Sequence, residues 1–78
     1  MLSGTWELKN PLSGKVYESF TFHEDGTYEY WHPDHGSLNS TYTINGNTIT
    51  NANGLTRRYE LKGNKLYFDN EEFPLTKA

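Results

Sequence analysis

Apolar and polar side chains alternate with a period of two along much of the chain, most completely between Tyr17 and Asn47. Alternate residues of a strand face opposite sides, and opposed residues of an antiparallel pair share a side. A three-residue loop, Glu24-Asp25-Gly26, sets Phe22 opposite Tyr28, whereas a two-residue turn would set Phe22 opposite Glu29. The longer loop also places glycine last, as a type I turn with a G1 bulge requires. It collects four aromatic rings on one face: Phe20, Phe22, Tyr28 and Tyr30.

The next connection, within the segment HPDHG, can be treated in the same way. A three-residue loop, Asp34-His35-Gly36, again ends in glycine. It predicts Tyr30 opposite Ser40 and Tyr28 opposite Tyr42. Two hairpins that independently agree on one apolar face favour three consecutive antiparallel strands.

The rest of the chain continues this pattern, and nowhere do apolar residues recur with helical spacing. Turn residues recur roughly every eight to twelve positions, the spacing of a small sandwich or barrel. Residues 3–9 (SGTWELK) form a predicted first strand, and we expect Leu12 in the following loop to fold back as a lid. The later turns are predicted at Gly46-Asn47, Ala52-Asn53-Gly54, Gly63-Asn64 and Asn70-Glu71, opposing Ile44 to Ile49, Leu61 to Leu66 and Phe68 to Phe73.

These elements predict an all-β fold in one domain, residues 1–78. About eight short strands joined by hairpins make an up-and-down antiparallel meander, and closing the first strand onto the last removes both bare edges. We therefore expect a small closed barrel. Its end with the EDG, NGN and KGN turns should be sealed by inward apolar side chains: Phe22, Tyr28, Ile44, Ile49, Leu61 and Leu66.

The composition argues against several classes of structure and function. The chain has no cysteine and a net charge of −3 without a basic run, which argues against disulfides and against nucleic acid as a partner. No apolar run is long enough for a membrane span or a signal peptide, so we expect either a cytoplasmic protein or the mature part of an exported one. No nucleophile elbow or phosphate-binding glycine loop occurs, so we expect no enzyme activity and no cofactor.

Several segments also resemble a known family. LSGTWEL contains the Gly-x-Trp signature of lipocalins, here Gly4-Thr5-Trp6, and FTFHEDGTY, TYTINGNTI and YELKGNKLYF are similar to bacterial lipocalin-like domains. The resemblance implies a lipocalin-like barrel, in a group often found in exported lipoproteins. Classical lipocalins are longer and carry a C-terminal helix, so a roomy cavity is not implied here. It also implies that a basic residue covers Trp6, with Lys77 and Arg57 as the two candidates.

The end of the barrel opposite the sealed one is predicted to be polar. Glu18, His32 and Ser40 have the inward phase there, with Tyr30 beneath them, and Arg57 is inward further along the wall. Our hypothesis is that Glu18, Tyr30, His32, Ser40 and Arg57 bind a small, partly apolar ligand at the barrel mouth. Unbroken register places Glu18 opposite His32, so we expect these two to form a pair. The alternative is an internal Glu18–Arg57 pair, or side chains that extend to water.

Two further groups of residues are candidate sites. Trp31 and Tyr17 have the outward phase, and exposed aromatics are enriched at binding surfaces, so the alternative function is a protein-interaction or structural module with a filled barrel. A covering role over neighbouring side chains would explain Trp31 equally well. His32, Asp34 and His35 share one turn, but three turn residues without a second ligand pair are weak support for a metal, and none is predicted.

Overall fold

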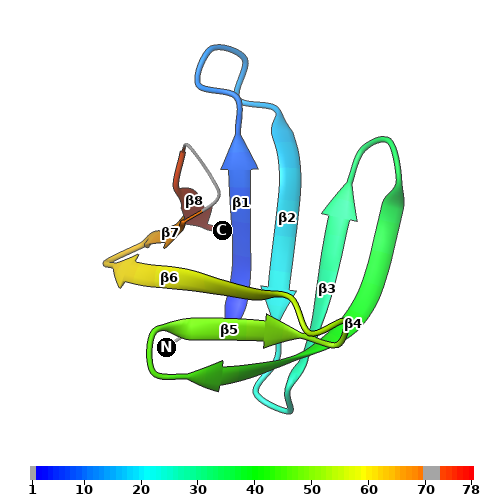
Figure 1. Cartoon of the computed structure of the whole chain (residues 1–78). Helices are drawn as coiled ribbons and strands as arrows, with labels where there is room; N and C mark the ends of the chain where they lie inside the picture. Colours follow the sequence, from blue (N-terminus) through cyan, green and yellow to red (C-terminus); the bar gives the residue numbers. More distant parts are fainter. Residues whose placement is uncertain (1, 70–72) are drawn as a thin grey trace.

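The computed structural model describes residues 2–69 and 73–78 and contains eight antiparallel strands (Figure 1). The described residues contain no helix. The strands are β1 (Gly4–Lys9), β2 (Val16–Phe22), β3 (Thr27–His32), β4 (Gly36–Asn45), β5 (Thr48–Asn51), β6 (Thr56–Lys62), β7 (Lys65–Phe68) and β8 (Leu75–Lys77).

The strands follow one another in sequence order around a closed barrel. Closure is made by β1 and β8, where Trp6 is opposite Lys77 and Glu7 is opposite Thr76. In Figure 1, β1 to β4 stand side by side, β5 and β6 run across them, and β7 and β8 return to β1. The predicted all-β, up-and-down meander closed into a barrel is confirmed.

Most of the predicted registers are also confirmed. Phe22 pairs with Tyr28, Ile44 with Ile49 and Leu61 with Leu66. The predicted turn Asn70-Glu71 lies outside the described residues, and the predicted register of the two strands that it joins is seen where Leu66 pairs with Leu75. Positive φ angles occur at Gly26, Gly36 and Gly54, the glycines placed last in the predicted three-residue loops.

The β3–β4 register differs from the prediction by two residues. His32 pairs with Gly36, so Tyr28 is opposite Ser40 and Tyr30 is opposite Leu38. The turn begins at His32, whose carbonyl accepts the amide of His35 at 3.2 Å. Its second position is Pro33, which suits that position because its φ is already fixed. Gly36 therefore follows the turn instead of ending it, and a shift of two leaves every side chain on its predicted face.

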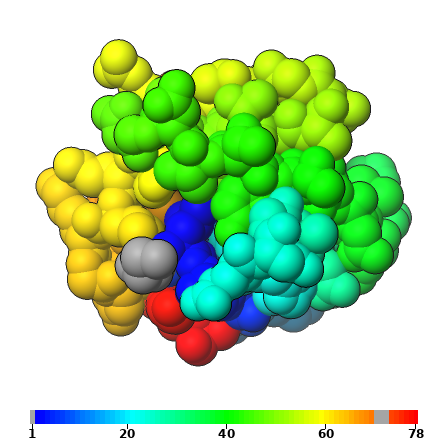
Figure 2. All heavy atoms as spheres, turned by 90° about the horizontal axis from the view of Figure 1, so that it is seen from below, coloured from blue at the N-terminus to red at the C-terminus, as the bar shows by residue number. Residues whose placement is uncertain are grey.

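The best-buried side chains gather near the seam and at the predicted sealed end. They are Leu2, Trp6, Phe22, Ile49, Leu66, Phe68 and Leu75. Figure 2 views this end and shows the blue N-terminal segment at its centre, framed by cyan, green, yellow and red segments. Of the side chains expected to seal it, Phe22, Ile49 and Leu66 are buried and Tyr28 and Leu61 are partly buried, but Ile44 is 43% exposed.

Trp6 is covered by Lys77, which decides between the two basic candidates. The Lys77 ammonium lies 5.2 Å from the centre of the Trp6 ring and donates to the Ser3 carbonyl at 3.0 Å. Gly4 makes room for it, because a Cβ at Gly4 would lie 2.9 Å from Lys77 Cε. The spacing of glycine and tryptophan in the Gly-x-Trp segment thus has a steric reason.

Leu12 does not form the expected lid, since its side chain is 96% exposed. The loop from Asn10 to Lys15 closes on itself instead. Asn10 Oδ1 accepts the amide of Leu12 at 2.8 Å, and the Asn10 carbonyl accepts the amide of Gly14 at 2.8 Å. A loop that satisfies its backbone in this way turns Leu12 toward solvent.

The first testable prediction concerns Gly4. Gly54→Ala should destabilise the fold by about 1–2 kcal/mol, because Gly54 has φ +83° and open space around its Cβ position. Gly4→Ala should cost more, since it adds displacement of Lys77 to an unfavourable φ of +119°. In a Lys77→Ala background the cost of Gly4→Ala should fall. Urea unfolding of the single and double variants measures this, and equal costs in both backgrounds would contradict the role given to Gly4.

Candidate functional site

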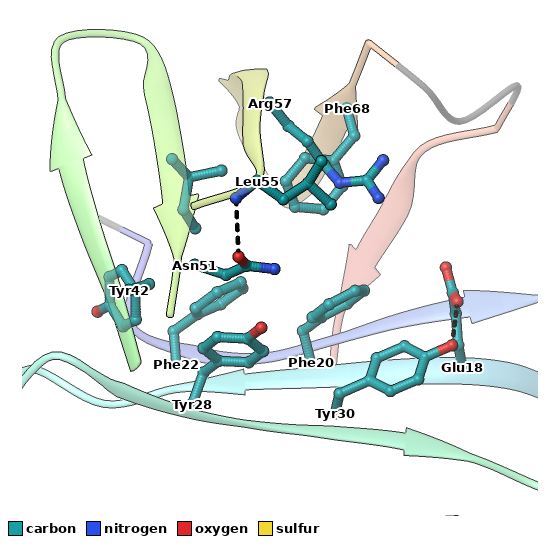
Figure 3. A pocket seen from close by; sticks show the side chains of 11 residues that line it. Glu18, Phe20, Phe22, Tyr28, Tyr30, Tyr42, Asn51, Leu55, Arg57 and Phe68 are labelled. Atoms are coloured by element: carbon teal, nitrogen blue, oxygen red, sulfur yellow. Dashed lines mark hydrogen bonds between the residues drawn. The ribbon is translucent and has the colours of Figure 1, made fainter. Parts of the chain in front are cut away.

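A pocket of about 240 Å³ lies between the aromatic face of β2 and β3 and the strands β5, β6 and β7 (Figure 3). Its lower wall in Figure 3 is a row of rings, and Asn51, Leu55 and Arg57 lie above it. The lining residues are Glu18, Phe20, Phe22, Tyr28, Tyr30, Tyr42, Ile49, Asn51, Leu55, Arg57 and Phe68.

The ring row, which we call the aromatic floor, consists of Phe20, Phe22, Tyr28 and Tyr30. The predicted hairpin register produces it directly, and the ring centres are close: Phe20 lies 4.9 Å from Tyr30 and Phe22 lies 5.6 Å from Tyr28. Phe20 and Phe22 stack with an interplanar angle of 3°. Close packing of this kind gives the pocket a preformed apolar base.

Glu18 stands at one end of the floor. A bulge between β1 and β2 falls where Leu8 pairs with Glu18 and Lys9 with Val16, so the phase from Glu18 to Phe22 is unbroken. Tyr30 donates its hydroxyl to Glu18 Oε2 at 2.8 Å. The other oxygen, Oε1, is buried and has no hydrogen-bond partner among the described residues.

The expected pair between Glu18 and His32 does not form. The ion pairs within the described residues are Lys9–Glu7 and Lys62–Glu60. His32 instead accepts the Asp34 amide on Nδ1 at 3.1 Å, and its ring lies 5.0 Å from that of His35. The inward phase of both residues was predicted correctly, but each side chain takes a nearer partner.

Of the five residues predicted to bind a ligand, Glu18, Tyr30 and Arg57 line the pocket, whereas His32 and Ser40 do not. The corrected register sets Ser40 opposite Tyr28 instead of Tyr30. The alternative Glu18–Arg57 ion pair is likewise absent from the described residues.

Asn51 is the lining residue that sequence reasoning missed. Asn51 pairs with Tyr42, and its backbone amide donates to the Leu55 carbonyl at 3.0 Å across the predicted loop of residues 52–54. The signal was available, because Asn51 has the same phase as the inward Ile49. Asparagine next to a glycine-containing loop is also an ordinary turn residue, so its type alone does not indicate a position in a pocket.

The outer aromatics lie where they were predicted. Tyr17 is 50% exposed and Trp31 is 37% exposed. Trp31 is opposite Ser19 on one side and Ser37 on the other. These small neighbours leave part of the indole uncovered.

Two other features concern metals and membranes. Within residues 2–69 and 73–78, no three His, Cys, Asp or Glu side chains are grouped closely enough to hold a metal ion. In the same part of the chain, no helical segment has the length and apolar character of a membrane span.

Tyr42 closes the pocket beside Phe22, with ring centres 5.2 Å apart. Its hydroxyl donates to the His23 carbonyl at 2.7 Å. Burial raises the pKa of the Tyr42 phenol above its ordinary value, and the carboxylates of Asp25 and Glu24 raise it further. The neighbouring Asp25 has a lowered pKa, chiefly because Thr27 donates its hydroxyl to that carboxylate.

Comparisons with protein-family models, curated proteins and solved structures each found no match to the chain.

The second prediction concerns alkaline pH. A raised pKa in the folded state means that the folded protein holds the phenol proton more tightly than the unfolded chain, whose pKa is near 10. The stability from Tyr42 is therefore complete below pH about 10 and lost as pH rises through the folded-state pKa. We expect the stability advantage over Tyr42→Phe in denaturant unfolding to be constant below about pH 10 and to shrink as the pH is raised further. Tyr67→Phe controls for the loss of one phenol, and an advantage that grew with pH would contradict the assignment.

Proposed function

We propose that this protein is a small, non-enzymatic lipocalin-like barrel that binds a small, partly apolar ligand in the pocket above the aromatic floor. The supporting observation is the pocket itself, in which an apolar base faces three polar side chains, Glu18, Asn51 and Arg57. Largely apolar pockets with a few directed polar groups are the usual form of small-molecule sites. The lipocalin resemblance of the Gly4-Thr5-Trp6 segment supports the same function.

The size of the pocket limits the ligand. Its volume of about 240 Å³ is well above the roughly 10–15 Å³ that one water requires. It is below the range of about 300–1,000 Å³ typical of sites for drug-sized molecules. A compound built on a single ring is therefore the best fit.

The third prediction tests the pocket by filling it. Leu55 lines the pocket and is 49% exposed, so Leu55→Trp adds bulk there without disturbing the buried core. We expect single-ring aromatic compounds, such as 3-phenylpropanol, to bind the unaltered protein in ligand-observed NMR and to lose binding in Leu55→Trp. Leu38→Trp is the matched control, because Leu38 is 60% exposed and does not line the pocket. Failure of the whole panel to bind the unaltered protein would refute the proposal.

A second candidate function is protein interaction through the outer face of β2 and β3. The observation that favours it is the exposure of Tyr17 and Trp31 on that face, with Trp31 flanked by two serines. Exposed tryptophan and tyrosine are enriched at interaction hot spots.

The fourth prediction separates the two candidates. A protein partner bound through this face should bind Leu55→Trp as well as the unaltered chain, and its affinity for Trp31→Thr should fall at least tenfold in a titration. Threonine keeps the strand propensity of the position while removing the indole. A partner whose affinity survived Trp31→Thr would not use this face.

A further inference from the structure

The side-chain amide of Asn51 is held in one orientation by the turn that follows it. Asn51 Oδ1 accepts the backbone amides of Asn53 and Leu55, each at 3.0 Å. The oxygen and nitrogen of a carboxamide point in different directions, so these two bonds direct Nδ2 away from the turn. Figure 3 shows that Nδ2 faces the space above the aromatic floor. The turn therefore uses the acceptor of Asn51 and leaves its two N–H donors to the pocket.

Arg57 presents further donors on the same face. Arg57 is opposite Ile49, so Asn51 and Arg57 are diagonal neighbours across β5 and β6. The Cα atoms of such neighbours are about 7–8 Å apart. Figure 3 shows the guanidinium extending from β6 above the floor. Neither ion pair found in the described residues involves Arg57. A planar guanidinium binds carboxylates through two parallel hydrogen bonds, a geometry that an ammonium cannot reproduce.

Glu18 makes the two ends of the pocket electrostatically different. It precedes Phe20 by two residues and Phe22 by four on β2. Asn51 is opposite Tyr42, whose ring contacts Phe22. Glu18 and Asn51 thus occupy opposite ends of the floor, as Figure 3 also shows. The negative charge of Glu18 disfavours an anion at its own end. An anionic group is directed to Asn51 and Arg57, and a second anionic group at the far end would be repelled.

From this arrangement we infer that the pocket takes a small aromatic monocarboxylate, with its carboxylate on Asn51 Nδ2 and the Arg57 guanidinium and its ring on the floor. The inference rests on the proposed function, because it names the ligand class for the same pocket. The rings of Phe20 and Phe22 offer the ligand an apolar surface, and ring–ring contact adds to simple burial.

Three probes with one phenylpropyl body test the inference: 3-phenylpropanoate, 3-phenylpropanamide and 3-phenylpropylammonium. They differ only in the charge and hydrogen bonding of the head group. NMR titration should show 3-phenylpropanoate binding at least tenfold more tightly than the amide, with the ammonium weakest. Chemical-shift changes should centre on the rings of Phe20, Phe22 and Tyr28 and on the side-chain amide of Asn51.

Asn51→Asp is the sharpest variant, because it keeps an oxygen for the Asn53 and Leu55 amides and replaces the N–H donors by a second oxygen. We expect this variant to bind 3-phenylpropanoate at least tenfold more weakly than the unaltered protein does. It should bind 3-phenylpropylammonium more tightly than 3-phenylpropanoate. Arg57→Gln should also weaken 3-phenylpropanoate at least tenfold. Arg58→Gln is the matched control, since Arg58 is exposed on the outward phase of β6. Arg57→Gln carries the test alone should Asn51→Asp fail to fold.

The outcomes are distinguishable. Equal affinity for the three probes, or a carboxylate preference that survives both substitutions, overturns the carboxylate inference and leaves a pocket of broader specificity. Binding of the phenylpropyl body that Leu55→Trp abolishes still supports the proposed function in that case. If none of the three probes binds, and none of the single-ring aromatic compounds binds either, both the carboxylate inference and the proposed function are overturned.

Discussion

The pairing of β1 with β8 is the constraint on which the rest of this barrel depends. The largest fully buried side chains, Trp6, Leu66 and Leu75, come from the strands at or beside this seam. Hydrogen bonds cross it: the Ala78 amide donates to the Thr5 carbonyl at 2.9 Å and the Lys77 ammonium donates to the Ser3 carbonyl at 3.0 Å. Without closure, β1 and β8 would each expose an unpaired edge. The most deeply buried side chains thus lie where the first and last strands pair.

Side chains of β1, β7 and β8 supply much of the buried core, so the aromatic residues of β2 and β3 can line a pocket instead. Phe20, Tyr28 and Tyr30 are only partly buried, although they share a face with the buried Phe22. Their rings pack against one another along the floor, and the strands opposite leave a pocket above them. Because these rings pack against one another, the aromatic floor does not need a ligand for its stability, and the faces that remain exposed offer apolar contact to one.

Sequence alternation predicted faces more reliably than it predicted partners. The predicted β3–β4 register was wrong by two residues because the turn begins at His32, with Pro33 at its second position. Every face was still correct, but Leu38 instead of Ser40 is opposite Tyr30. Glu18 and His32 have the predicted phase, yet Glu18 accepts from Tyr30 and His32 from the Asp34 amide. Alternation fixes the side of the sheet, whereas side-chain partners depend on lengths and rotamers that a pattern does not contain. The predicted lid role of Leu12 was wrong because Asn10 accepts the backbone amides of its own loop and the leucine side chain is left in solvent.

Polarity on the inward phase is the feature that connects fold and site. No polar or charged side chain among the described residues is fully buried. Glu18, Asn51 and Arg57, polar residues on inward-facing positions of three strands, all line one pocket. Unpaired polar groups in a dry core are costly, so an inward polar residue in a barrel of this size indicates where the core gives way to accessible space. Asn51 shows how such a residue also serves folding: its oxygen completes the turn, and its nitrogen remains for the pocket.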